Sequence, residues 1–284
     1  MRHDEASNTM QGPARLRAAH QVLDHDPKIH VDPIAVGLTP ESSVDSILAA
    51  EPSIRSRPNT LLRSAFVLRA RYAEDCLAQA ARAGVSQYVI LGAGLDTFAY
   101  RQPDYARAMR IFEADHPTTL VWKRACLARR GLVPPANLAY VAVDFERDRV
   151  AERLAAQGFD ASEPAFFSWL GVVQYLSDPA IEATLRFIAG LAPGSAVALS
   201  FCVPDELLEG EDLELARQIA ATCAARGEPW LSRHRPGDLN ALATRLGFSS
   251  ASLLSPEAAE QRYFLGRSDG LRAPRYMQLF NAKV

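Results

Sequence analysis

Short apolar stretches alternate with amphipathic stretches over most of the chain after residue 84. The apolar stretches have the length of strands, and the amphipathic ones carry apolar residues at helical spacing. This alternation is typical of a parallel sheet built from strand–helix–strand units. The predicted strands span residues 87–91, 110–115, 138–143, 165–169, 195–203, 250–254 and 276–280, and the predicted helices span residues 120–130, 149–157, 178–189 and 236–246.

The first 57 residues follow a different pattern, because five prolines interrupt it and leave room only for short helices. A long helix is predicted from the segment Arg57-Pro58-Asn59-Thr60 to Gly84, where glycine gives a C-terminal stop. We therefore expect a helical cap over residues 1–84 and a sheet-based domain over residues 85–284. The expected fold class is α/β, with a Rossmann-like, mostly parallel seven-stranded sheet that carries helices on both faces.

Composition and charge narrow the classes of partner. Of the 284 residues, 48% are hydrophobic and 23% are charged, and the formal net charge is −2. This balance is ordinary for a soluble domain and gives no electrostatic reason to expect nucleic acid or an acidic membrane surface. No segment has the length of a signal peptide's apolar region or of a membrane span, which needs about 20 apolar residues.

The four cysteines are far apart and form no CxxC pair. Their apolar neighbours predict buried thiols, which favours a reducing cytoplasm over a disulfide framework and argues against a metal site. The oligomeric state stays open between monomer and homodimer.

Two glycines follow the first predicted strand directly. Gly92 and Gly94 flank Ala93, and such a turn lets a ligand approach the backbone because glycine has no Cβ. Glu113 and Asp115 end the second strand, nineteen and twenty-one residues after Gly94. At that spacing a carboxylate can accept hydrogen bonds from the hydroxyls of a ribose.

A third acid, Asp144, follows the third predicted strand, where it could accept a hydrogen bond from an adenine amino group. Phe145 beside it could stack on the adenine ring. The glycine turn and the acids after two successive strands together predict a cofactor that contains adenosine. A tight turn with solvated loop acids is the alternative explanation of the same residues.

The residues after the glycines distinguish between adenosine cofactors. A dinucleotide fingerprint has a small residue where this chain has Thr97, so that the pyrophosphate can reach the helix N-terminus. Asp96, just before it, would repel a pyrophosphate but suits the cationic amino group of S-adenosyl-L-methionine; it could also cap the following helix. We therefore predict S-adenosyl-L-methionine. An NAD(P)-dependent oxidoreductase and a non-catalytic S-adenosyl-L-methionine-binding protein remain alternatives, whereas an α/β-hydrolase would need a GxSxG elbow that this sequence lacks.

Several blocks in the same order resemble one family. They are residues 92–101 (GAGLDTFAYR), 112–117 (FEADHP), 143–146 (VDFE), 175–176 (YL) and 262–267 (RYFLGR). Together they resemble the S-adenosyl-L-methionine-dependent O-methyltransferases of the leucine carboxyl methyltransferase-like family, including bacterial members that tailor polyketides. The resemblance covers residues 58–284 and, more loosely, the N-terminus through Asp32-Pro33. It implies a class I methyltransferase fold with an N-terminal helical cap.

The resemblance also implies an activity and roles for single residues. The expected reaction is methyl transfer to a carboxylate or phenolic hydroxyl of a small molecule, such as a polyketide or another secondary metabolite. Arg69 would hold the carboxylate of the cofactor, Gly92 would lie against its methionine part, and Asp115 would bind the ribose, with Glu113 as a second candidate. Further candidates for contact with the cofactor are Ala93, Gly94, Asp96, Asp144, Phe145 and Trp169, although Trp169 is expected first of all in the core.

His116 and Tyr175 are the catalytic candidates. A hydroxyl acceptor would benefit from a general base, whereas a carboxylate acceptor is already ionised at pH 7 and needs none. A glutamate that is common in the family five residues before the tyrosine is replaced here by Leu170, so its contacts cannot be carried over. Four other histidines, at positions 20, 25, 30 and 234, lie in polar segments and are expected to be solvated.

Overall fold

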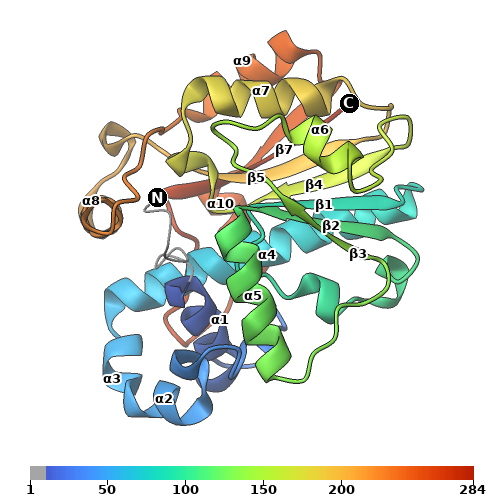
Figure 1. Cartoon of the computed structure of the whole chain (residues 1–284). Helices are drawn as coiled ribbons and strands as arrows, with labels where there is room; N and C mark the ends of the chain where they lie inside the picture. Colours follow the sequence, from blue (N-terminus) through green and yellow to red (C-terminus); the bar gives the residue numbers. More distant parts are fainter. Residues whose placement is uncertain (1–10) are drawn as a thin grey trace.

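A seven-stranded sheet forms the centre of the computed structural model, which describes residues 11–284 (Figure 1). The strand order is β3-β2-β1-β4-β5-β7-β6. The first five strands run parallel, and β7 runs antiparallel to both β5 and β6, so the predicted mostly parallel sheet is confirmed. The strands are β1 (Gln87–Leu91), β2 (Arg110–Asp115), β3 (Leu138–Ala142), β4 (Ala165–Trp169), β5 (Ala196–Cys202), β6 (Ser250–Leu254) and β7 (Met277–Lys283).

Helices cover both faces of the sheet (Figure 1). Helices α4 and α5 lie on one face, and α6, α7 and α9 lie on the other, while α1, α2 and α3 gather beyond α4. The helices are α1 (Gln11–Leu23), α2 (Val44–Ala49), α3 (Glu51–Ile54), α4 (Arg57–Arg82), α5 (Pro117–Arg129), α6 (Val150–Ala155), α7 (Asp178–Ala189), α8 (Gly210–Ala225), α9 (Pro236–Leu246) and α10 (Pro256–Ala259). Single 3-10 turns occur at Pro33–Ala35, Pro40–Ser42, Phe98–Tyr100, Asp104–Ala106, Val173–Tyr175 and Asp205–Leu207, and a π-helical turn spans Glu260–Phe264.

The core lies between the sheet and its two helical layers. Every residue of β1, β4 and β5 is buried, as expected for central parallel strands that are covered on both faces. Helix α4 contributes Leu61, Ala65, Leu68 and Leu77 to the same hydrophobic cluster as these strands. The predicted boundary after residue 84 therefore lies just after α4 in the chain. This helix packs on the sheet and connects the sheet to the N-terminal helices.

A buried ion cluster fixes the N-terminal segment to α4. The guanidinium of Arg63 donates to both oxygens of Asp24, at 2.6 and 2.9 Å, and His20 contacts the same carboxylate at 2.8 Å. The ring of His20 is fully buried and that of His30 nearly so, because Asp24 and Glu74 are their partners. The expectation of solvated histidines is therefore wrong for these two, while His25 is exposed and His234 is partly buried.

Helices α8 and α10 and the length of α1 were not foreseen from the sequence. Helix α1 has 13 residues, although only short helices were expected before residue 57, and α8 was not predicted at all. Among residues 11–284, no helix combines the length and the apolar character needed to cross a membrane.

Candidate active site

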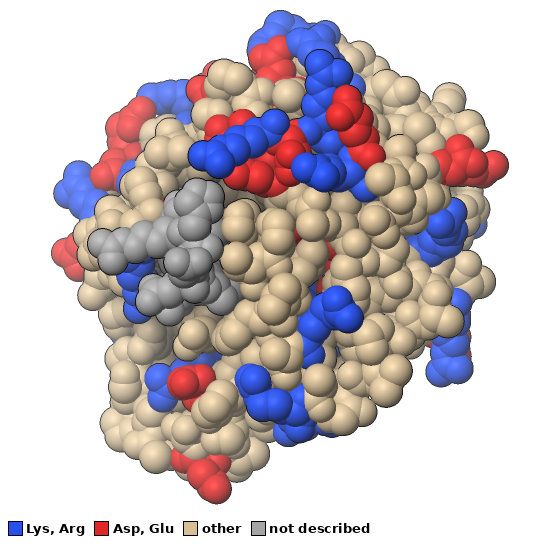
Figure 2. All heavy atoms as spheres, in the orientation of Figure 1, with Lys and Arg blue, Asp and Glu red and all other residues tan. Residues whose placement is uncertain are grey.

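A cavity of about 910 Å³ opens at the carboxyl ends of β1 to β5. Helices α1, α4 and α8 close its other sides. On the face shown in Figure 2, charged side chains of both signs are interspersed around a broad area formed by other residues. Ligands of open α/β sheets bind at this edge, so the cavity lies where the sequence places its candidate site.

The glycine turn forms the floor of the cavity, and its shape requires glycine. Gly92 has φ +69°, and a Cβ there would lie 2.1 Å from Cγ2 of Val172. Gly94 also has a positive φ, and its N–H donates to Oδ2 of Asp115 at 2.6 Å. The turn after β1 is thus held against the end of β2 with its backbone open to the cavity.

Asp115 is the acid of β2 that faces the cavity. Its second oxygen accepts from the N–H of His116 at 2.6 Å, so both oxygens are oriented by backbone groups and keep lone pairs for a ligand. Burial raises the pKa of Asp115, while the two N–H groups and Lys123 act in the opposite direction.

Glu113 does not line the cavity, so its predicted contact with a ribose finds no support in the structure. Its side chain is fully buried, with Nζ of Lys123 at 2.7 Å. Glu113 and Asp115 share one face of β2, but Glu113 lies one pleat further from the strand end, where α5 covers it. The ion pair therefore belongs to the packing of α5 on the sheet.

The buried Glu113–Lys123 pair should leave a signature in the pH dependence of stability. Burial raises the pKa of Glu113 from its ordinary 4.5 to about 7, although Lys123 opposes the shift. Between these two values the folded chain binds a proton that the unfolded chain has lost, so stability falls as pH rises. The free energy of unfolding should drop by about 1.4 kcal/mol per pH unit from about pH 5 to pH 7 relative to a Glu113→Gln/Lys123→Met variant. Urea unfolding at each pH measures this difference, and parallel profiles for the two proteins would contradict the assignment.

Asp144 and Phe145 line the cavity just beyond β3. Oδ1 of Asp144 accepts from the N–H of Glu146 at 3.1 Å, which orients the carboxylate. The ring centre of Phe145 lies 6.5 Å from that of Trp169. Trp169 is fully buried and does not line the cavity, as expected for a core residue, and it supports Phe145 from the core. Its predicted contact with the cofactor finds no support in the structure.

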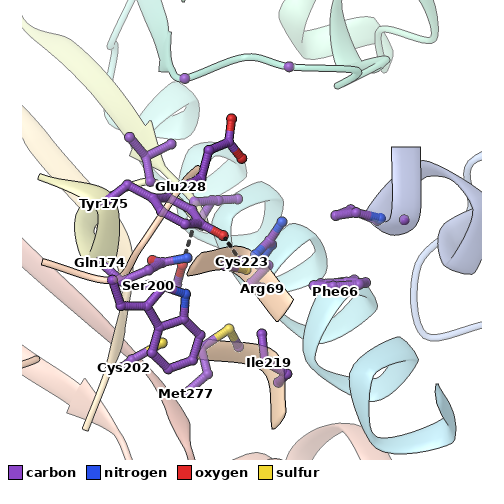
Figure 3. Close-up of a pocket in the computed structure, with 18 of the residues that line it drawn as sticks. Phe66, Arg69, Gln174, Tyr175, Ser200, Cys202, Ile219, Cys223, Glu228 and Met277 are labelled. Carbon is purple, nitrogen blue, oxygen red and sulfur yellow. Dashed lines mark hydrogen bonds between the residues drawn. The ribbon is translucent and has the colours of Figure 1, made fainter. Parts of the chain in front are cut away.

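Arg69 points from α4 into the cavity (Figure 3). Its guanidinium packs on Gly171, where a Cβ would come within 2.2 Å of Nη1, and it lies 4.8 Å from the ring centre of Phe66. Burial lowers its pKa to about 10, so the group is still a cation at pH 7. Among residues 11–284 it has no hydrogen-bonded or ion-paired partner, and a partly buried cation without such a partner favours an anionic ligand.

The two catalytic candidates line the same cavity but lie apart in the sheet. His116 follows β2 and Tyr175 follows β4, with β1 between those strands. The ring of His116 contacts Oγ1 of Thr118 at 2.8 Å, and the hydroxyl of Tyr175 contacts Sγ of Cys223 at 3.4 Å (Figure 3). The structure therefore does not bring them together as an acid–base pair.

Asp96 lies at the start of the 3-10 turn and at the cavity. Its Oδ1 accepts from the N–H of Phe98 at 2.7 Å, and its side chain also lines the cavity. Ala93 and Leu170 line the cavity as well, so a side chain without charge stands where the resembled family has a glutamate.

Sequence reasoning missed a polar network behind the glycine turn. Oγ1 of Thr97 donates to Oδ1 of Asp32 at 2.7 Å, and Arg17 on α1 donates to the carbonyl of Leu95 at 2.5 Å. Asp32 is 1% exposed and is flanked by Arg17 and Arg101. The segment Asp32-Pro33 was the only signal of this network in the sequence, and it links the N-terminal helices to the turn.

The described residues contain no group of three or more His, Cys, Asp or Glu side chains that could hold a metal ion.

Comparisons with known proteins agree with this geometry. The profile of the family described as leucine carboxyl methyltransferase matches residues 11–189. YktD of Bacillus subtilis, whose name assigns it provisionally to the S-adenosyl-L-methionine-dependent methyltransferases, is 31% identical over 206 residues, which are 72% of this chain and 67% of YktD. A Mycobacterium avium protein with the same provisional assignment is 35% identical over 223 residues, which are 77% of this chain and 70% of that protein.

Solved structures support the fold. A crystal structure of a DUF574 family protein from Streptomyces avermitilis has a TM-score of 0.60 at 17% identity and covers 98% of this chain and 97% of its own. A provisionally named methyltransferase from Thermobifida fusca has a TM-score of 0.58 at 19% identity, with 95% and 93% covered. The fold is thus the Rossmann-like fold of class I methyltransferases. The chain belongs to the leucine carboxyl methyltransferase family and is a methyltransferase that uses S-adenosyl-L-methionine.

Proposed function

We propose that this protein transfers a methyl group to an oxygen atom of a small molecule, either a carboxylate or a phenolic hydroxyl. The observation that carries the proposal is one continuous cavity of about 910 Å³, which runs from the glycine turn to α8. Pockets for single ligands span about 300–1,000 Å³, so this cavity is at the upper end and has room for a second ligand beside the cofactor. A role in secondary metabolism would fit such an acceptor.

The residues present fit S-adenosyl-L-methionine. Arg69, a cation without a protein partner among residues 11–284, would hold the carboxylate of the cofactor, and Asp96 would face its amino group. Asp115 would accept from the ribose hydroxyls, and Asp144 and Phe145 would hold the adenine. The open backbone at Gly92 would let the methionine part lie close to the turn.

When bound, the cofactor supplies a methyl group on a positively charged sulfur. The protein's own residues would position the acceptor oxygen in line with that bond and exclude water. Burial raises the pKa of Tyr175, so its hydroxyl is protonated at pH 7 and could orient an acceptor but not remove its proton. His116 lies beside Asp115, at the end of the cavity proposed for the ribose. The positions of Tyr175 and His116 therefore favour a carboxylate acceptor, which needs no general base.

The test is a turnover assay that detects S-adenosyl-L-homocysteine with a panel of carboxylic acids and phenols. We expect release that depends on the acceptor and a product whose new methyl group is on oxygen. Methylation at nitrogen or carbon would contradict the proposal. Binding of the cofactor without turnover of any carboxylic acid or phenol would also contradict the proposal.

Thr97 argues against the alternative of an NAD(P)-dependent oxidoreductase. The side chain of Thr97 is 1% exposed and donates to Asp32, so it fills the position that a dinucleotide fingerprint leaves to a small residue. A thermal-shift comparison should show stabilisation by S-adenosyl-L-homocysteine and none by NAD⁺ or NADP⁺.

A further inference from the structure

The cavity continues beyond the glycine turn into a region that the cofactor contacts proposed above leave free. We call this region the α8 chamber and define it by six lining residues: Phe66, Cys202, Ile219, Cys223, Trp230 and Met277. They come from α4, the end of β5, α8, the loop after α8 and the start of β7 (Figure 3). The chamber thus lies beside β4 and β5, whereas the acids Asp115 and Asp144 lie at β2 and β3.

The sheet and the loop after α8 give the chamber a fixed shape. Cys202 and Met277 are register partners in the antiparallel pair of β5 and β7, so their positions are set by the ladder. The carbonyl of Gln174 accepts from the N–H of Leu231 at 2.7 Å, which holds the loop that carries Trp230 against the turn after β4. The chamber is therefore a formed site in this structure.

The six residues that define the chamber are soft and apolar, while Gln174 and Glu228 also line this end of the cavity (Figure 3). Three of the six residues carry sulfur and two carry aromatic rings. Burial raises the pKa of Cys202 to about 12, so its thiol is uncharged at pH 7, and Cys223 contacts the hydroxyl of Tyr175. Polarizable sulfur makes favourable contacts with aromatic rings beyond those that an alkyl group makes. Such a wall favours a flat aromatic ligand over a saturated one of the same size.

Polar groups lie at the border between the chamber and the glycine turn. Arg69 packs on Gly171 at this border, and Oγ of Ser200 accepts from the N–H of Gly171 at 2.7 Å (Figure 3). A ligand whose ring fills the chamber would therefore direct a polar substituent toward the turn, and that is the side from which the methyl group must come.

On the basis of the proposed function, we propose that the acceptor is an aromatic molecule. Its ring system occupies the α8 chamber and its oxygen substituent points to the border at Gly171. Ile219 and Met277 are the residues that determine this specificity. Ile219 sets the width of the chamber from α8, and Met277 presents its sulfur from β7.

The experiment is calorimetric titration of the full chain saturated with S-adenosyl-L-homocysteine. The probes are 2-naphthoic acid and 2-naphthol, with decahydronaphthalene-2-carboxylic acid as the saturated counterpart. We expect saturable binding of at least one naphthalene probe, at least threefold tighter than binding of the saturated acid. Ile219→Trp, which fills the chamber, should weaken that binding at least tenfold. Met277→Leu, which removes the sulfur at similar volume, should weaken it at least twofold and leave the saturated acid unchanged.

Ala221→Trp is the matched control, because Ala221 is an exposed residue of α8 that does not line the cavity. It should change no affinity by more than twofold, and all variants should bind S-adenosyl-L-homocysteine like the wild type. The inference is overturned if neither naphthalene probe binds, if the saturated acid binds as tightly, or if Ile219→Trp has no effect. Failure of the wild type to bind S-adenosyl-L-homocysteine would instead overturn the proposed function, and this inference with it.

Discussion

Replacing Asp115 with alanine should lower the affinity for S-adenosyl-L-homocysteine at least about 100-fold. The proposed role of this carboxylate is to accept hydrogen bonds from two ribose hydroxyls, and a hydrogen bond to a charged group contributes about 1.5–3 kcal/mol. Two such bonds correspond to at least a factor of about 100 in the dissociation constant. The variant also releases the N–H of Gly94, which Asp115 holds at 2.6 Å, so the glycine turn loses its support at the same time.

Isothermal titration calorimetry measures this change directly. Asp115→Asn keeps the size and one acceptor oxygen, and it should lose less affinity than Asp115→Ala. The matched control is Asp104→Ala, since Asp104 is an exposed acid that does not line the cavity. If Asp115→Ala keeps an affinity within threefold of the wild type while it remains folded by circular dichroism, the assignment of the ribose to Asp115 is refuted.

The place of the site could be predicted because it follows from the order of the strands. Gly92 follows β1, Asp115 ends β2 and Asp144 lies just beyond β3, and the carboxyl ends of such parallel strands meet at one edge. The central strands were equally clear, because β1, β4 and β5 are buried on both faces and read as short apolar runs. The local hydrophobic pattern and the strand order were sufficient to predict the place of the site and the central strands.

Strand order and residue spacing are not sufficient to predict the role of Glu113. Its spacing from the glycines suits a ribose nearly as well as that of Asp115, and both side chains lie on one face of β2. What separates them is Lys123 on α5, whose ammonium group is 2.7 Å from Glu113. How far an overlying helix reaches along a strand depends on packing, which strand and helix periodicity do not encode.

The parts that could not be predicted depend on pairs of residues far apart in the chain. Thr97 is held by Asp32, which is 65 residues away, and His30 by Glu74. In each case a polar residue in a polar segment is buried because a distant partner meets it. The α8 chamber has the same origin, since its walls come from segments between Phe66 and Met277 that only the fold brings together.

Replacing Asp24 should cost much of the stability of the fold. Its side chain and that of His20 are fully buried, and Arg63 is 1% exposed. Burial alone would raise the pKa of Asp24, but the hydrogen bonds from His20 and Arg63 lower it, so the carboxylate is ionised at pH 7. Asp24→Asn leaves the guanidinium of Arg63 buried without a counter-charge. Removing one partner of a buried ion pair costs about 3–5 kcal/mol, and the free energy of unfolding should fall by that amount.

Urea unfolding at pH 7 tests this prediction against two other variants. Arg63→Lys keeps the charge but loses the two-pronged contact, at 2.6 and 2.9 Å, and should be destabilised less than Asp24→Asn. Glu182→Gln breaks an exposed pair with Arg186 and should cost less than about 1 kcal/mol. A loss for Asp24→Asn no larger than that for Glu182→Gln would show that the cluster does not hold the N-terminal helices to α4. The expected large loss would make this cluster the anchor of the segment that carries Arg17 and Asp32 to the glycine turn.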